Sequence, residues 1–197
     1  MHLLATTGGT MEGAADAVDL KQSPADIVVL TAADSEIASL AAAFDGTSVI
    51  TLRLANFLAL QHPLSVDLYI EKTLAHSRLI VLRLLGGASY WPYGLDQIEA
   101  VAKANNIMLA VLPGDSQPDA DLTSRSTLPL MDCERLRSYL TAGGRPNAVK
   151  FLNYCRHLLD GTDNPGPAEP LQPVGVYRDT RDQHEFASGI IFYRSVI

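Results

Sequence analysis

Five short apolar runs most strongly constrain the fold of this chain. None of them alternates apolar and polar residues, as half-exposed strands do. Continuous apolar strands are typical of a parallel sheet that helices cover on both faces. The sequence therefore predicts a mostly parallel sheet of five buried strands. These strands are expected at His2–Ala5, Ile27–Leu30, Val49–Leu54, Leu79–Leu85 and Ile107–Leu112.

Helical patterns lie between or after these runs, and several begin at residues suited to capping. Asp34 or Ser35 would cap a helix that ends at Ala43, and Ser65 would cap a helix over Val66–His76. Further helices are expected over 95–105, over 133–140 with Asp132 as its cap, and over 146–159. Strand and helix in repeated order predict a doubly wound α/β fold. The first crossover, residues 11–25, is the weakest because it has no clean apolar face.

A change of composition near residue 160 indicates the end of the first domain. Residues 161–173 contain four prolines and two glycines, which cannot continue a helix or a central strand. We therefore expect an α/β head domain over 1–160 and a linker over 161–173. Residues 174–197 would then be the truncated start of a second α/β domain, because GIIFYRS has the pattern of an opening strand.

Charge and cysteine content exclude several classes of partner. The 197 residues carry 22 acidic and 15 basic side chains, a net charge of −7, which argues against broad contact with nucleic acid. Cys133 and Cys155 fit no CxxC pattern and are expected to be reduced thiols. The start of the chain lacks the basic and apolar regions of a signal peptide, and the most apolar run is too short to span a bilayer. We expect a soluble cytoplasmic protein with no nucleic-acid or membrane partner.

The turn after the first run, with Thr7, Gly8, Gly9 and Thr10, has three interpretations. Its backbone N–H groups could bind phosphate, although it matches neither GxGxxG nor a Walker loop. The simpler interpretation is that the glycines permit a tight turn from strand to helix. The turn is also similar to the nucleophile loop of bacterial asparaginases. An amidohydrolase that uses Thr7 or Thr10 is therefore an alternative, but a nucleophile needs an oriented base and the sequence supplies none.

Polar residues also follow the later strands. Asp34 follows the second run, Arg53 and Asn56 lie at or after the end of the third, and Pro113–Ser116 follows the fifth. The carboxyl ends of parallel strands meet at one edge, so these turns are expected to converge on a crevice. Asp34 is either a helix cap or a ligand contact in this interpretation.

The most informative turn is the aromatic loop after the fourth run, with Gly86, Gly87, Tyr90, Trp91 and Tyr93. We expect it to be an exposed, rigid loop at the carboxyl end of a strand. Its rings either stack on a flat ligand or a partner surface, or close the top of the domain. The first role would make this domain a binding or docking module without chemistry of its own.

No pattern of metal ligands or paired carboxylates is visible. The five histidines show neither i,i+4 nor HExxH spacing, and no cysteine or carboxylate cluster joins them. We expect no metal site built wholly from this chain and assign no catalytic residue.

Four segments carry a resemblance to a known family. They are LLATTGGT (3–10), VDLKQSPADIVVLTAADSE (18–36), the long segment over 52–98, and LAVLPGD (109–115). With these residues the chain resembles the N-terminal part of the large subunit of aerobic cobaltochelatases, the CobN family, which belongs with the magnesium-chelatase H subunits. The resemblance covers nearly all of residues 1–160 and returns at IIFYRS (190–195).

The resemblance implies an ATP-dependent metal–nitrogen ligase of cobalamin biosynthesis. A complete subunit of this family binds Co(II) and the corrin precursor hydrogenobyrinic acid a,c-diamide, and two AAA+ subunits, CobS and CobT, hydrolyse ATP. Family members are several times longer, and their cavity for macrocycle and metal corresponds to no residue of this chain. The resemblance therefore implies a fragment that binds no cofactor and is not catalytic alone. It leaves the loop from Gly86 to Tyr93 as the candidate contact with substrate or with the rest of the subunit.

Overall fold

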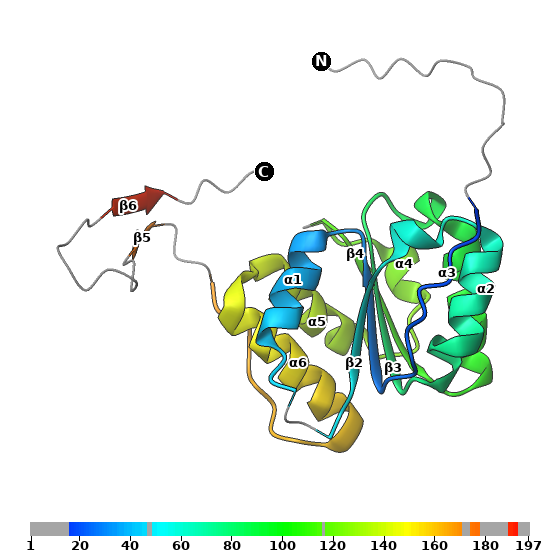
Figure 1. The fold of residues 1–197 in the computed structure, drawn as a ribbon. Helices are drawn as coiled ribbons and strands as arrows, with labels where there is room; N and C mark the ends of the chain where they lie inside the picture. The colour runs from blue at the N-terminus through cyan, green and yellow to red at the C-terminus, as the bar shows by residue number, and fades with distance from the viewer. Residues whose placement is uncertain (1–15, 47–48, 116, 171–173, 178–188, 193–197) are drawn as a thin grey trace, which may run out of the picture.

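A computed structural model describes residues 16–46, 49–115, 117–170, 174–177 and 189–192. Its centre is a parallel sheet of four strands in the order β2-β1-β3-β4 (Figure 1). The strands are β1 (Ile27–Thr31), β2 (Leu52–Asn56), β3 (Leu79–Leu84) and β4 (Met108–Pro113). Four of the five expected strands are thus confirmed, whereas the strand expected at His2–Ala5 lies outside the described residues.

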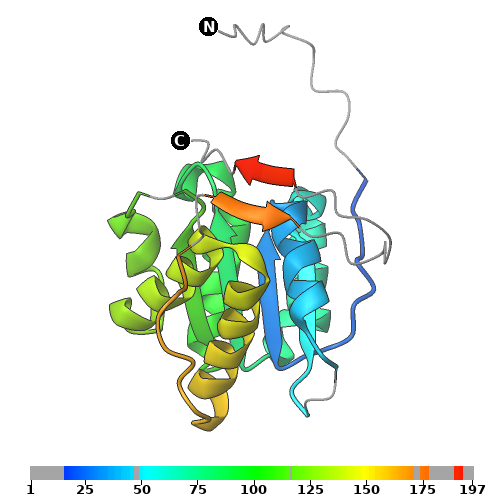
Figure 2. The ribbon, with the colours of Figure 1, turned by 90° about the vertical axis from the view of Figure 1, so that its left-hand side faces the viewer.

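Helices cover both faces of this sheet, as the apolar strands predicted. One face carries α2 (Pro63–Lys72) and α3 (Pro92–Ala104). The opposite face carries α1 (Asp34–Ala43), α5 (Leu130–Ala142) and α6 (Gly144–Asp160), of which α1 and α6 lie in front of the sheet in Figure 2. Shorter helices are η1 (Phe57–Leu60), η2 (Leu74–His76), η3 (Ala88–Tyr90) and α4 (Ala120–Ser124).

Two apolar cores, one on each face, explain why the strands do not alternate. In β1, Val28 and Leu30 pack toward α2 and α3, while Ile27 and Val29 pack toward α1, α5 and α6. All of these side chains are buried, as is every residue of β3. Since successive side chains of a strand point to opposite faces, a strand covered on both sides must be apolar throughout.

Two helix starts differ from expectation. Helix α2 begins at Pro63, and His62 Nδ1 caps it by accepting from Leu64 N at 3.1 Å. Ser65 is buried within the helix instead, where its Oγ accepts from Val18 N at 2.8 Å. Proline suits the first helical turn because its missing N–H would have no partner there.

Helix α5 begins at Leu130 after Pro129, so Asp132 is not its cap. The Asp132 carboxylate accepts from Tyr154 Oη at 2.6 Å and thereby joins α5 to α6. Asp132 therefore bonds to a side chain of another helix and not to the backbone at the start of its own helix.

The described part of the first crossover is extended. Residues 16–26 contain no helix and run beside α2 and β2. Gln22 anchors this segment through two hydrogen bonds. Its side-chain Oε1 accepts from Tyr69 Oη at 2.7 Å, and its backbone carbonyl accepts from Thr73 Oγ1 at 2.9 Å. The absence of a clean apolar face in the sequence agrees with this path, since a helix there would have no stripe to bury.

After α6 the chain returns along the helix toward its first turn. Glu169 N donates to Asn147 Oδ1 at 2.8 Å, and Tyr139 Oη donates to the Gly166 carbonyl. Farther on, β5 (Val174–Tyr177) and β6 (Gly189–Phe192) form a separate antiparallel pair. The boundaries at residues 160 and 173, and a second α/β domain, stay predictions. Within the described residues, no helix is long and apolar enough to cross a membrane.

Candidate functional site

The carboxyl edge of the sheet contains the point where the direction of winding reverses. From β1 the chain crosses to β2 on one side, and β3 and β4 then follow on the other side of β1. Open α/β sheets form their binding crevice at such a point, between the two adjacent strands. Here the crevice lies between Thr31 and Arg83, which are register partners at the ends of β1 and β3.

A polar network joins the strands and helix that border this crevice. Thr31 Oγ1 donates to Glu36 Oε2 at 2.8 Å, and Glu36 Oε1 forms an ion pair with Arg83 Nη1. Arg83 Nη2 donates to the Gly114 carbonyl at 2.8 Å. The network therefore connects β1, α1 and β3 with the turn after β4.

Arg83 is the most deeply buried charged side chain of this network, with 8% of its side chain exposed. Burial lowers the pKa of its guanidinium, and the nearby positive charge of Arg137 lowers it further, whereas Asp115 opposes the shift. Its Nε finds no hydrogen-bond partner in the described part of the chain. A buried guanidinium that faces a carboxylate forms an internal ion pair. If either residue is removed, the charge of the other is left without compensation.

The crevice beside the network has a volume of about 200 Å³ and a mainly apolar lining. Its walls come from the ends of β1 and β3, the first turn of α1 and the turn after β4. A Cβ on Gly114 would lie 2.7 Å from the backbone of Leu85, so the chain segments after β3 and β4 meet here more closely than a side chain allows. The lining residues are Thr31, Ala32, Ala33, Glu36, Arg83, Leu85 and Gly114.

Neither Asp34 nor Ser35 caps α1, contrary to one interpretation. The N-cap position is Ala33, which offers no side-chain oxygen. Asp34 Oδ1 instead accepts from Asn56 Nδ2 at 2.8 Å, which joins the turns after β1 and β2. These two turns therefore meet at the carboxyl edge, as predicted.

The aromatic loop follows β3 at this same edge, also as predicted. Gly86 and Gly87 have φ values of 96° and 79°, a backbone conformation that favours glycine. A Cβ on Gly86 would approach the Tyr90 ring to 3.3 Å, so the ring lies directly over this turn.

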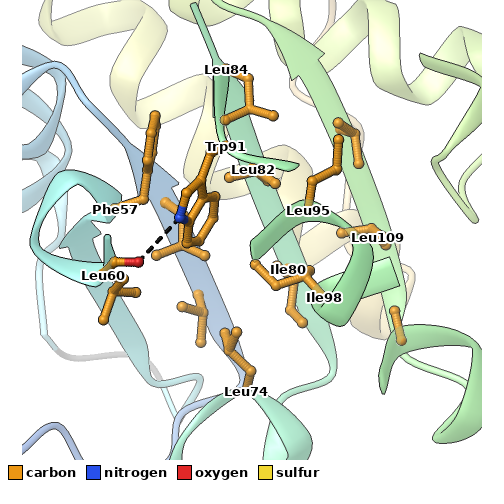
Figure 3. Packing of buried hydrophobic residues seen from close by; sticks show 14 of the residues in the cluster. Phe57, Leu60, Leu74, Ile80, Leu82, Leu84, Trp91, Leu95, Ile98 and Leu109 are labelled. Carbon is orange, nitrogen blue, oxygen red and sulfur yellow. Dashed lines mark hydrogen bonds between the residues drawn. The ribbon is translucent and has the colours of Figure 1, made fainter. Parts of the chain in front are cut away.

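Trp91 points into the core and not outward, so the expectation of an exposed ring is wrong for this residue. Only 4% of Trp91 is exposed. Its ring stacks on Phe57 with centroids 5.0 Å apart, and its Nε1 donates to the Leu60 carbonyl at 3.1 Å (Figure 3). A Cβ on Gly94 would lie 2.1 Å from this ring, so the first turn of α3 has room for the indole only because residue 94 is glycine. Burial with its N–H satisfied is the favourable arrangement for tryptophan.

The two tyrosines of the loop remain at the surface. Tyr90 is 52% exposed and Tyr93 is 39% exposed. Tyr93 Oη donates to Asp67 Oδ1 at 2.8 Å, and this hydrogen bond raises the pKa of the phenol. Of the aromatic side chains that the sequence singled out, these two can contact a ligand or another protein surface.

A second hollow, of about 420 Å³, lies beside Gly86 and Gly87. Asp115 and Asp119 are its acidic members, and both accept hydrogen bonds from nearby backbone N–H groups. Asp119 caps α4 in this way by accepting from Leu122 N at 3.0 Å. The two carboxylates therefore have local structural partners.

The described residues bring together no group of three or more His, Cys, Asp or Glu side chains that could hold a metal ion. Thr7, Gly8, Gly9 and Thr10 lie outside the described residues, so their predicted roles stay predictions. The network around Arg83 was not predicted from the sequence. Its signal was Arg83 itself, a charged residue in an otherwise apolar buried strand.

Comparison with known proteins gives clear relatives, although no family model matches. The chain is 46% identical over 180 residues to the aerobic cobaltochelatase subunit CobN of Sinorhizobium sp, a match that covers 90% of this chain and 14% of that protein. It is 42% identical over 165 residues to the protein of the same name from Pseudomonas aeruginosa, which covers 83% and 13%. The chain thus spans about one seventh of the length of these relatives.

One solved structure has the same fold over most of the described domain. It is the catalytic subunit of cobaltochelatase from Mycobacterium tuberculosis, with a TM-score of 0.62 and 24% sequence identity. The similarity covers 79% of this chain and 12% of the other. At this identity the likeness shows a shared fold.

Proposed function

Because the chain belongs to the CobN family of aerobic cobaltochelatase subunits, we propose that it forms the head domain of such a subunit in cobalamin biosynthesis. The reaction would be ATP-dependent insertion of Co(II) into hydrogenobyrinic acid a,c-diamide. The identity of 46% over 180 residues carries this proposal. The AAA+ subunits CobS and CobT would hydrolyse the ATP, and the macrocycle and cobalt, both substrates, would bind elsewhere in the subunit.

Within that subunit we assign this domain a structural role and not a catalytic one. Thr31, Glu36 and Arg83, the polar groups at the usual crevice of such a sheet, are already paired with one another. A group engaged in a buried ion pair is poorly placed to transfer protons or to bind a substrate. The buried free thiols Cys133 and Cys155 support a reducing, cytoplasmic location.

A chimeric subunit tests the proposal. The matching segment of the Sinorhizobium CobN is replaced by this chain, and the product is assayed with Co(II), hydrogenobyrinic acid a,c-diamide, ATP and the two AAA+ subunits. We expect the absorbance of a cobalt corrin to develop with the chimera but not with the 197-residue chain alone. A folded chimera that inserts no cobalt would contradict the family role, and turnover by this chain alone would contradict the structural role.

A further inference from the structure

Five large apolar side chains are exposed together at the carboxyl edge, and we call this surface the apolar rim. It is formed by Leu58, Leu64, Leu85, Tyr90 and Tyr93, whose exposed fractions range from 39% to 60%. An exposed apolar side chain is ordinary when it stands alone, but a contiguous group marks an interaction surface.

Contacts between the supporting segments bring the rim residues to the same part of the carboxyl edge. Tyr90 meets Phe57 edge to face at a centroid distance of 6.3 Å, which joins η3 to η1 and hence to the neighbouring Leu58. The hydrogen bond from Tyr93 to Asp67 joins the first turn of α3 to α2, where Leu64 lies three residues before Asp67 on the same helix face. Leu85 precedes the turn over which the Tyr90 ring lies. Figure 3 shows the buried Phe57, which contacts Tyr90 of the rim, beside the Trp91 ring on which it stacks.

The segments that form the rim lack Asp, Glu, Lys and Arg almost completely. Residues 54–66 and 84–95 contain none of these four residue types, whereas they make up 19% of the whole chain. Asp67 borders the rim, and Tyr93 is already bonded to it. Depletion of charge with enrichment of tyrosine is the composition of the buried centre of a protein interface.

The path of the chain and the length of its relatives indicate what covers the rim. Residues 161–170 return along α6, and Glu169 bonds to Asn147 in the first turn of that helix. This turn begins at Gly144, and Gly143 and Gly144 border the same hollow as Ser35 and Glu36 of α1, so the turn lies at the carboxyl edge. The polypeptide thus leaves the described domain at the edge that carries the rim. Most of the length of the CobN relatives lies outside the match and is joined to this domain covalently.

We infer that the apolar rim is the surface on which the remainder of the large subunit packs, through an uncharged and largely apolar surface of its own. This inference rests on the proposed function, because the occupant is the rest of a CobN-family subunit. Covalent linkage gives the occupant a high effective concentration, so a rim of modest size suffices to hold it. Tyr90 and Tyr93 are then interface residues and not contacts of the macrocycle.

Thiol labelling of the chimera tests the inference. Leu64→Cys, Leu85→Cys and Tyr90→Cys are made singly, and modification by a maleimide is followed at each site by peptide mass spectrometry. The native Cys133 and Cys155 are buried and provide an internal reference for intact folding. We expect each introduced thiol to react at least about tenfold more slowly in the chimera than in the 197-residue chain, because a covered site reacts only when it opens.

Met131→Cys is the matched control. Met131 is 75% exposed in the first turn of α5, and the segment before it pairs with the start of β4 at the opposite edge of the sheet. Its thiol is expected to react equally fast in both proteins. Equal rates at the rim positions would overturn the inference.

Other occupants give different patterns, each of which would also overturn the inference. Protection that depends on the concentration of the short chain would indicate a second copy. Protection that develops only on addition of hydrogenobyrinic acid a,c-diamide, or only with the AAA+ subunits, would indicate those partners. Cobalt insertion is measured on the same chimera, so an active chimera with an unprotected rim separates failure of this inference from failure of the proposed function.

Discussion

The carboxyl edge of the sheet combines two surfaces of opposite chemistry. Between β1 and β3, the buried Arg83 and the half-buried Glu36 form an ion pair inside the domain. In the apolar rim, Tyr90 and Tyr93 are partly exposed to solvent. A buried charge is unfavourable unless it has a partner inside the protein. An exposed aromatic ring needs no internal partner and can bind another surface. We therefore assign the polar groups in the usual crevice to the stability of the fold and the adjacent rim to assembly.

Truncation of a buried and of an exposed aromatic residue should have very different effects on stability. Trp91→Ala is expected to lower the free energy of unfolding by about 3–5 kcal/mol, because it leaves a cavity under the rim. Tyr93→Ala, its control, should cost no more than about 1 kcal/mol, since the ring is partly exposed and its hydrogen bond lies at the surface. Urea unfolding followed by circular dichroism measures both. Similar losses in the two variants would show that the rim is part of the core.

Removal of one partner of the buried ion pair gives the next largest effect. Arg83→Leu should destabilise the chain by about 3 kcal/mol, because Glu36 is left without its counter-charge. Adding Glu36→Leu should recover part of this loss, since the double variant contains no unpaired charge. The same urea titration applies, and a double variant less stable than Arg83→Leu would show that the pair is not an isolated structural unit.

Gly94→Ala tests the packing of Trp91, because its effect on the free energy of unfolding should change sign when the indole is removed. In the native chain, Gly94→Ala places a methyl group against the indole and should cost about 1–3 kcal/mol. In the Trp91→Ala background the space is free, and the same change should stabilise α3 by up to about 1 kcal/mol. A double-mutant cycle by thermal unfolding gives the coupling between the two residues. Equal effects in both backgrounds would exclude the close contact.

The smallest expected effect concerns Asp26 at the opposite edge of the sheet. Hydrogen bonds from the backbone N–H and the hydroxyl of Thr51, together with Arg78, lower the pKa of this carboxyl below its usual 3.8. Its contribution is therefore present above pH 3.8 and is lost as the pH falls through the lowered value of the folded state.

Asp26→Asn should remove this part of the acid sensitivity. The difference in stability between native chain and variant is expected to be greatest at neutral pH and to shrink below about pH 4. Unfolding curves between pH 2 and 7 measure this difference. A difference that does not change with pH would show that Asp26 acts through its shape and not through its charge.

Local patterns predicted the elements of this fold better than their boundaries. The apolar runs located four strands because a doubly covered strand leaves a continuous apolar signature. Helix starts were less predictable: Asp34 and Asp132 have the chemistry of caps, yet Asn56 and Tyr154 bind them instead. A local capping bond has a strength similar to that of a tertiary hydrogen bond, so sequence spacing cannot decide between them.

The amino-acid sequence was enough to predict the layered α/β architecture and the aromatic loop after β3, and it carries the resemblance to the CobN family. Which aromatic side chain is buried could not be predicted in this way, because Trp91 and Tyr93 lie two residues apart in the same charge-free segment. Trp91 is buried because Phe57, Leu60 and Gly94 form a slot for one indole beneath the loop. The burial of a side chain depends on residues that are distant in the sequence and adjacent in the fold, so a local sequence pattern cannot predict it.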